Sequence, residues 1–210
     1  MKYDSWKYLF PPRPESAIPP DMLAFYEKRG WVCQYKKNGT CTIIGVSPDR
    51  KLIAINRHQE NHKAWQLTQH IKDALRSIFT KPLWYVVVAE IMHSKTPTIK
   101  DTIFIHDILV HESEYLVGTT FKERQEILNP YLLTNVETKT HYVCDTDGKV
   151  WFAKIYDKGF ADLFRSIKEP KIDEGLVLKD PNGKLRSCDR ADANSSWQVK
   201  CRHSTKSYQF

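Results

Sequence analysis

The chain has 210 residues, of which 41% are hydrophobic and 12% aromatic, and this composition excludes a wholly disordered protein. Lys and Arg total 32 against 25 for Asp and Glu, so the net charge of +7 favours a polyanionic partner, with simple solubility as the alternative explanation. No apolar run approaches the roughly 18 residues that span a bilayer, so we expect no membrane partner, and five scattered cysteines without a C-x-x-C pair argue against zinc or disulfides.

Residues 1–20 are expected to be irregular, because prolines at positions 11, 12, 14, 19 and 20 exclude a long helix. Apolar side chains such as Trp6 and Leu9 are expected to pack on the core as a strap. The segment lacks the layout of a signal peptide, which together with the cysteine usage predicts a cytoplasmic, intracellular protein, encoded by a cell or a virus. A helix is expected next, at about 20–29.

Residues 31–46 are rich in strand-forming residues and contain Asn38-Gly39, a strong hairpin signal, so they predict two strands joined by a tight turn. A third strand is expected at 52–56. Residues 59–79 carry apolar side chains at helical spacing and predict a helix that ends before Pro82.

The second half of the chain mixes strand and helix signals. The elements expected are, in order, strands at 83–92 and 102–110, a helix at 121–129, a hairpin at 141–153, a helix at 160–167, and strands at 175–178 and 197–201. The first of these strands is almost wholly apolar and is therefore expected at the centre of a sheet. Without repeats or a linker, the chain predicts one α+β domain at 21–210 that follows the strap at 1–20.

Four short polar segments occur in a fixed order. They are Lys36-Lys37-Asn38-Gly39, Ala89-Glu90-Ile91, Glu174-Gly175-Leu176-Val177-Leu178-Lys179 and Lys200-Cys201-Arg202. Each is a weak signal alone, but together they provide one amine nucleophile, two carboxylates and a pair of cations. These are the groups that a site needs to capture a nucleoside triphosphate on a lysine.

Lys36 is the expected nucleophile, because it lies at the mouth of a tight turn in which Gly39 lets the backbone approach a phosphate. Lys37 should point to the opposite face of the strand, since side chains alternate, and we interpret it as surface charge. Taken alone, the segment 36–39 is better explained as a basic hairpin turn.

The two carboxylates would serve the nucleotide and a metal. Glu90 ends a buried apolar strand, where it needs a metal, a hydroxyl group or a structural salt bridge as partner. Glu174 opens a strand and suits the orientation of Mg²⁺, or Mn²⁺, beside a triphosphate. Lys200 and Arg202 share one strand face and would neutralise phosphate charge, unless they are only a solvated basic tail.

The ordered set resembles the covalent nucleotidyltransferase superfamily of ATP-dependent DNA ligases, RNA ligases and mRNA capping enzymes. Lys36-x-Asn38-Gly39 resembles the family's K-x-D/N-G adenylation motif, and Glu90 resembles the glutamate that contacts the nucleotide ribose. Residues 174–179 match the motif whose glutamate serves the metal, and Lys200-x-Arg202 takes the place of a K-x-K motif.

The resemblance also implies contacts to the phosphates and the base. Arg57 is placed like the family arginine that holds nucleotide or nucleic-acid phosphate. An aromatic residue that stacks on the purine normally precedes Asp-Ile or Asp-Leu; His106 holds that position here, with Phe104 as the second choice. Gln34, two residues before the nucleophile, is expected to contact the base edge. The implied fold is the ligase adenylation domain, in which two packed, mainly antiparallel sheets flanked by helices hold the nucleotide between them.

The resemblance implies an ATP-dependent polynucleotide ligase that seals 5′-phosphate and 3′-hydroxyl ends of nicked or broken nucleic acid through a lysyl-AMP intermediate. Thr40 after Gly39, with no arginine shortly afterwards, favours RNA over DNA. The chain ends eight residues after Arg202, so no C-terminal OB-fold is expected, and a partner chain could supply the substrate clamp. The alternatives are a minimal DNA ligase that seals nicks and a non-catalytic module that binds nucleotide or nucleic-acid ends.

Overall fold

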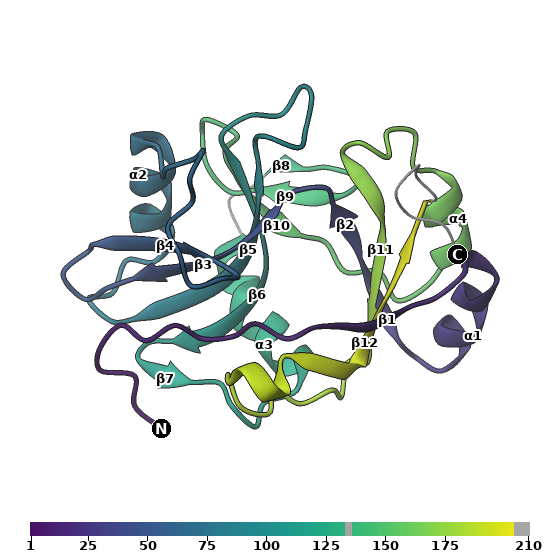
Figure 1. Ribbon diagram of the computed structural model, residues 1–210, viewed down its shortest axis with the longest axis horizontal. Coiled ribbons are helices and arrows are strands. Elements are labelled where there is room, and N and C mark those ends of the chain that lie inside the picture. Colours follow the sequence, from purple (N-terminus) through teal and green to yellow (C-terminus); the bar gives the residue numbers. More distant parts are fainter. Residues whose placement is uncertain (133–135, 204–210) are drawn as a thin grey trace.

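The computed structural model describes residues 1–132 and 136–203, whose strands form two sheets that face one another (Figure 1). The smaller sheet has the order β1-β12-β11-β2, and the larger sheet has the order β4-β3-β5-β6-β10-β9-β8, with β7 paired to β6. The strands are β1 (Arg13–Ala17), β2 (Val32–Lys37), β3 (Thr40–Val46), β4 (Leu52–Asn56), β5 (Tyr85–Met92), β6 (Thr102–His111), β7 (Glu114–Tyr115), β8 (Val136–Glu137), β9 (His141–Val143), β10 (Val150–Ala153), β11 (Asp173–Lys179) and β12 (Asn194–Arg202). The helices are α1 (Leu23–Lys28), α2 (Gln69–Ile78), α3 (Phe121–Leu128) and α4 (Phe160–Arg165), with 3₁₀ turns η1 (Pro20–Met22), η2 (Asn129–Leu132) and η3 (Arg190–Asp192).

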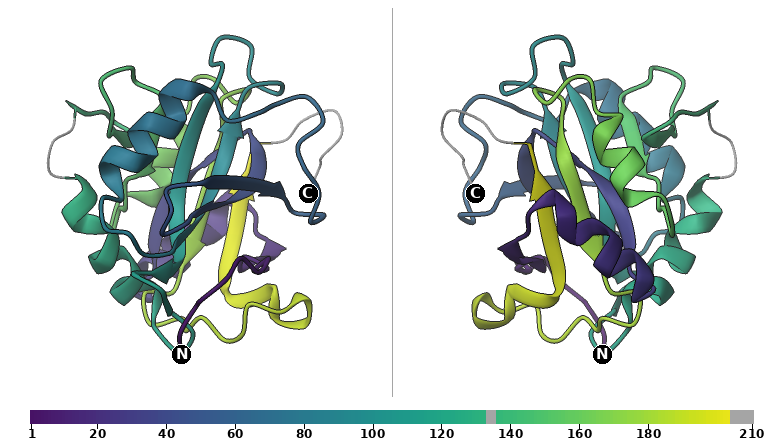
Figure 2. Two further views of the ribbon diagram at one scale, coloured as in Figure 1. Left: turned by 90° about the vertical axis from the view of Figure 1, so that its left-hand side faces the viewer. Right: turned by 90° about the vertical axis from the view of Figure 1, so that its right-hand side faces the viewer.

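The smaller sheet is apolar on its outer face and polar on its inner face. Tyr35 of β2 and Leu176 and Leu178 of β11 join an outer apolar cluster with Leu23 of α1 and Phe160 of α4. Figure 2 shows α1 and α4 covering this outer face. Because side chains alternate along a strand, the residues between these apolar positions point inward, toward the larger sheet.

The larger sheet is built around β5, which lies between β3 and β6 as its apolar sequence predicts. Ile71 and Leu75 of α2 are buried in the main apolar cluster with β3, β5 and β6. Helix α3 begins with a capping box formed by Thr120 and Glu123 and packs against β6. The predicted α+β class with two packed sheets is confirmed. Among the described residues, no helix is long and apolar enough to cross a membrane.

The predicted hairpin around Asn38-Gly39 is wrong, although both of its strands exist. β2 pairs with β11 in the smaller sheet, whereas β3 pairs with β4 and β5 in the larger sheet. The turn therefore carries the chain from one sheet to the other. A local turn signal does not specify the pairing here, because each strand finds its partner far along the chain.

The helix predicted at 59–79 begins only at Gln69, because the Thr68 side chain accepts a hydrogen bond from the Ile71 amide and caps the helix there. Trp65 lies in the loop before this helix, and its side chain is buried there. Its spacing relative to the apolar residues of the helix is therefore misleading. The segment 1–20 packs on the core through Tyr3 and Leu9. It also contains β1, a strand that was not predicted and that pairs in parallel with β12.

Candidate active site

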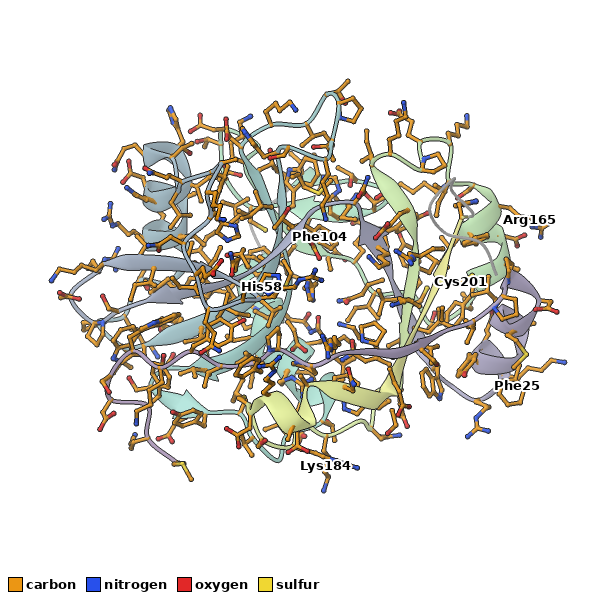
Figure 3. All side chains as sticks on the ribbon, viewed as in Figure 1. Phe25, His58, Phe104, Arg165, Lys184 and Cys201 are labelled. Carbon is orange, nitrogen blue, oxygen red and sulfur yellow. The ribbon has the colours of Figure 1, made fainter. Side chains whose placement is uncertain are left out.

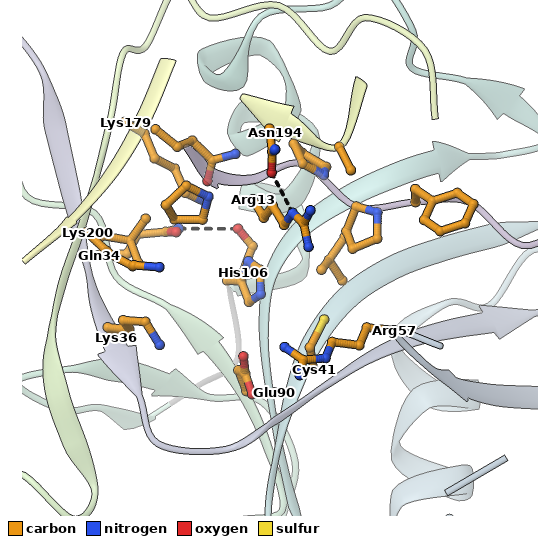
Figure 4. Close-up of a pocket in the computed structure, with 18 of the residues that line it drawn as sticks. Arg13, Gln34, Lys36, Cys41, Arg57, Glu90, His106, Lys179, Asn194 and Lys200 are labelled. Atoms are coloured by element: carbon orange, nitrogen blue, oxygen red, sulfur yellow. Dashed lines mark hydrogen bonds between the residues drawn. The ribbon is translucent and has the colours of Figure 1, made fainter. Parts of the chain in front are cut away.

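A cavity of about 770 Å³ lies between the inner faces of the two sheets, and most of the predicted site residues line it (Figure 4). Those that line it are Gln34, Lys36, Arg57, Glu90, Phe104, His106 and Lys200. Figure 3 places Phe104 near the centre of the molecule, between the two sheets. The fold thus brings together residues from both halves of the chain.

Lys36, near the end of β2, forms an ion pair with Oε1 of Glu174 at the start of β11. The pairing follows from strand register, because Lys36 lies opposite Gly175. Oε2 of Glu174 lies 3.7 Å from Nη1 of Arg202 on β12. Lys36 is therefore held at the cavity wall by a carboxylate that Arg202 supports from the neighbouring strand.

Gly39 lies where the turn after Lys36 approaches the larger sheet. A Cβ at this position would lie 2.8 Å from the Ile91 carbonyl oxygen and 2.9 Å from Oε2 of Glu90. Any side chain would force the turn away from β5. The Lys95 ammonium donates to the Gly39 carbonyl oxygen over 2.6 Å and fixes the turn from the other side. Glycine therefore lets the turn bring Lys36 close to Glu90.

Glu90 of β5 has a buried carboxylate oxygen, Oε2, without a hydrogen-bond partner among the described residues. Burial raises the pKa of Glu90 to about 7, although the charges of Lys36 and Lys95 act in the opposite direction. Cys41 lies directly opposite it on β3. A buried acceptor that faces a cavity without a partner is a candidate binding group for a ligand donor or a metal.

His106 and Phe104 lie on one face of β6, and their ring centroids are 6.4 Å apart. Burial, with the nearby charge of Lys179, lowers the pKa of His106 to about 3, so its imidazole is neutral at physiological pH. Phe104 is buried, and the Lys37 ammonium lies 5.4 Å from its ring centroid. Both rings offer an apolar face to a ligand in the cavity.

Arg57 and Lys200 add positive charge to opposite walls. Arg57 follows β4, and its Nε lies 3.3 Å from Nε2 of His58. Lys200 is on β12, where burial and the charges of Arg202 and Lys36 lower its pKa. Figure 4 shows Lys36, Arg57 and Lys200 around the same space, an arrangement that suits a polyphosphate.

Lys37 corrects the sequence analysis, because it is buried, with 3% of its surface exposed, and is not a surface charge. Its ammonium lies 2.6 Å from Asp173 and donates to Thr140 over 3.0 Å. The carboxylate that compensates it comes from β11, far away in the sequence. Lys37 thus links β2 to the adjoining strand and to the β8–β9 turn.

Three residues on the inner face of the smaller sheet were missed by the sequence analysis: Val177, Lys179 and Gln198 all line the cavity. The strict alternation of side chains between the two faces of a strand would have identified all three. Val177 and Lys179 follow Gly175 at steps of two, and Gln198 precedes Lys200 by two. Burial lowers the pKa of Lys179 to about 8.

Arg13 of the strap also lines the cavity, and its Nε donates to Oδ1 of Asn194 over 2.7 Å (Figure 4). No sequence motif marks this residue. It reaches the site because β1 pairs with the edge of β12.

From the sequence, Glu90 and Glu174 are expected to hold a metal. Among residues 1–132 and 136–203, no three His, Cys, Asp or Glu side chains form a group that could hold a metal ion. Glu90 and Glu174 nevertheless interact electrostatically, since the charge of Glu174 raises the pKa of Glu90. Mg²⁺ at nucleotide sites commonly takes one or two carboxylates together with phosphate oxygens and water, so this donor set fits a metal that arrives with a triphosphate.

No family model and no curated protein matches this chain, whereas solved structures match over most of its length. A mycobacterial DNA ligase D in complex with ATP and MES aligns with a TM-score of 0.65 and 12% identity, covering 92% of this chain and 60% of that chain. The ATP-dependent DNA ligase of bacteriophage T7 in complex with ATP aligns with a TM-score of 0.56 and 13% identity, covering 92% of this chain and 68% of that chain.

A DNA ligase of the Lig E type aligns with a TM-score of 0.50 and 11% identity, covering 83% of this chain and 62% of that chain. This chain spans 60% of the length of the ligase D chain above and 59% of that of the ligase domain from M. tuberculosis LigD. At these identities the alignments establish the fold. The chain has the fold of ATP-dependent ligases, as the sequence resemblance implied.

Proposed function

We propose that this chain is an ATP-dependent polynucleotide ligase that joins 5′-phosphate and 3′-hydroxyl ends through an AMP bound covalently to Lys36. The observation that carries the proposal is that Lys36, Glu90 and Lys200, from three different strands, line one cavity, with Glu174 of a fourth strand ion-paired to Lys36. A module that only bound nucleotide would have no need of a lysine held beside a carboxylate at the cavity wall.

In the first step, Nζ of Lys36 attacks the α-phosphorus of ATP, a P–N bond forms, and the P–O bond to pyrophosphate breaks. The amine must lose a proton before it attacks. Oε1 of Glu174 accepts the hydrogen bond of Nζ and is placed to take that proton. Lys200 and Arg57 would neutralise the charge that develops on the phosphate oxygens.

In the second step, a 5′-phosphate oxygen of the nucleic acid attacks the α-phosphorus of the lysyl-AMP, and the P–N bond breaks. In the third, the 3′-hydroxyl oxygen attacks the 5′-phosphorus and AMP leaves. Glu90, whose Oε2 is buried without a protein partner, is placed to accept a hydrogen bond from the ribose of AMP. Such a bond would hold the nucleotide in one orientation through all three steps.

Mg²⁺, or Mn²⁺ in its place, would be held by Glu174 and Glu90 together with the phosphates of ATP. When bound, it would polarise phosphoryl oxygens and offset their negative charge.

The polynucleotide in our proposal is RNA, because Thr40 follows Gly39 and no arginine comes shortly afterwards. A minimal DNA ligase is the second candidate, supported by the Glu-Gly-Leu-Val-Leu-Lys segment of β11. A partner chain that clamps the substrate is compatible with either.

The test incubates the protein with Mg²⁺ and α-labelled ATP or GTP, and then adds nicked RNA or nicked DNA with 5′-phosphates. We expect labelled protein with ATP and transfer of the label into sealed RNA. Lys36→Ala should abolish labelling, while Lys184→Ala, which changes an exposed lysine that does not line the cavity, at the lower edge of the molecule in Figure 3, should not. Labelling that persists in Lys36→Ala would move the nucleophile elsewhere, to Lys37 first. Sealing of DNA alone would favour the second candidate, and no adduct with either nucleotide would reject the ligase.

A further inference from the structure

Gln198 has no part in the steps above, yet it lies on the inner face of β12, two residues before Lys200. It is 2% exposed and lines the cavity. Its strand neighbour on β11 is Lys179, which is also buried and also lines the cavity. The Gln198 side chain therefore belongs to the deep end of the site.

The amide nitrogen of Gln198, Nε2, is buried and has no hydrogen-bond partner among the described residues. Its strand neighbour on β11, Lys179, does not supply one. The Lys179 ammonium is only a donor and cannot accept from it. A buried donor without an acceptor is destabilising, and such groups are rare in folded proteins unless a ligand completes them.

The depth of Gln198 identifies the part of a nucleotide that would reach it. Strand register places Lys36 level with Gly175 and Arg202, and Gln34 level with Val177 and Lys200. Gln198 lies four residues along β12 from the level of Lys36, which corresponds to about 13 Å at the usual rise per residue. An AMP bonded to Lys36 and extending into the cavity would bring its base, not its ribose, toward this level.

The walls of the cavity from the level of Lys200 to that of Gln198 fit a flat base. Val177 offers an apolar side chain from β11, and the neutral imidazole of His106 faces it from β6. Gln34 commits its own amide nitrogen to the His106 carbonyl oxygen over 3.4 Å, which leaves its oxygen as the acceptor for an exocyclic amino group (Figure 4). The remaining requirement of a purine is a donor for one of its ring nitrogens.

We propose that Gln198 is a specificity-determining residue whose Nε2 donates a hydrogen bond to a ring nitrogen of the purine. The inference rests on the proposed function and adds to it the contact that reads the base. Gln34 and Gln198 would then present an acceptor and a donor to the base, a combination that matches the donor and acceptor pattern of adenine.

The test measures equilibrium binding of a non-reactive ATP analogue with a methylene group between its α- and β-phosphorus, so that no covalent step intervenes. The variants are Gln198→Leu, which removes the amide, and Gln198→Glu, which keeps the shape but replaces the donor by an acceptor. Lys184→Ala is the control. We expect the Kd of both Gln198 variants to rise about tenfold, the effect of losing one buried hydrogen bond.

The 1-deaza, 3-deaza and 7-deaza forms of the same analogue identify the ring nitrogen. We expect one of them to bind the unmodified protein about tenfold more weakly than the parent analogue, and to bind Gln198→Leu as well as the parent does. Two results would overturn the inference while the ligase proposal stood. One is that the unmodified protein binds all three deaza analogues as tightly as the parent analogue. The other is that the Kd of Gln198→Leu for the parent analogue lies within twofold of the Kd of the unmodified protein. An unmodified protein that binds no ATP analogue would overturn both. Thermal unfolding of both variants would show whether they remain folded.

Discussion

Replacing Glu90 by glutamine should stabilise the protein at neutral and alkaline pH while impairing its activity. Burial raises the pKa of Glu90 from 4.5 to about 7. Each pKa unit corresponds to about 1.36 kcal/mol, so keeping this carboxylate ionised in the folded state costs about 3 kcal/mol. Glutamine has the same shape and carries no charge at any pH in this range.

The sign of the effect follows from which state holds the proton more tightly. The folded protein does, because the pKa of Glu90 is raised on folding. Its protonation stabilises the fold fully below pH 4.5, and this stabilisation is lost as the pH rises through about 7. Between pH 5 and pH 8 the wild-type protein should therefore lose about 2.5 kcal/mol relative to Glu90→Gln.

Urea unfolding at pH 5 and pH 8, followed by far-UV circular dichroism, measures this difference. The contributions of the other titrating groups to the free energy of unfolding are the same in both proteins and cancel. Glu126→Gln, at an exposed position, is the matched control and should show no such change. A difference between wild type and Glu90→Gln that stays constant with pH would refute the argument from burial. Adenylation of Lys36 should be slower in Glu90→Gln at pH 8, where Glu90 is ionised, since the ribose would lose a charged acceptor.

Three further outcomes are expected. Glu174→Ala should lower metal-dependent adenylation by orders of magnitude, measured with α-labelled ATP across a Mg²⁺ series; a near-wild-type rate would remove Glu174 from the metal site. His106→Ala should raise the Kd for ATP more than Phe104→Ala does, and the reverse order in a calorimetric titration would exchange their roles. Arg124→Met should lower the free energy of unfolding by about 4 kcal/mol, because it leaves the buried Asp107 carboxylate, 2.9 Å from Nε of Arg124, without its partner. Recovery of most of that loss in the double variant with Asp107→Leu is the check, and an additive loss in urea unfolding would contradict it.

Local signals predicted most strands of this protein but not the sheet to which each belongs. The apolar run of β5 predicted a central strand, and the structure has one there. Asn38-Gly39 predicted a hairpin, because the turn itself favours one. The strands on either side pair instead with β11 and β5, contacts between distant parts of the chain that leave no trace in the turn residues.

In the site, too, local motifs could be read from the sequence, whereas contacts between distant parts of the chain could not. Lys36, Glu90 and Lys200 could be predicted because each lies in a short motif, and all three line the cavity. The burial of Lys37 could not, because the carboxylate that compensates it, Asp173, lies far along the chain. Gln198 carries no motif, and only the strand register shows that it shares a face with Lys200.

The strap has a consequence for how this protein can be shortened or fused. Tyr3 and Leu9 are buried in the apolar cluster of the larger sheet, while β1 pairs with β12 at the edge of the smaller one. Deleting the first 17 residues would uncover an apolar groove on one sheet and a bare hydrogen-bonding edge on the other, and exposed edges of this kind lead to aggregation. Affinity tags belong ahead of Met1, which is exposed, and an N-terminal truncation that ends inside the strap should yield insoluble protein.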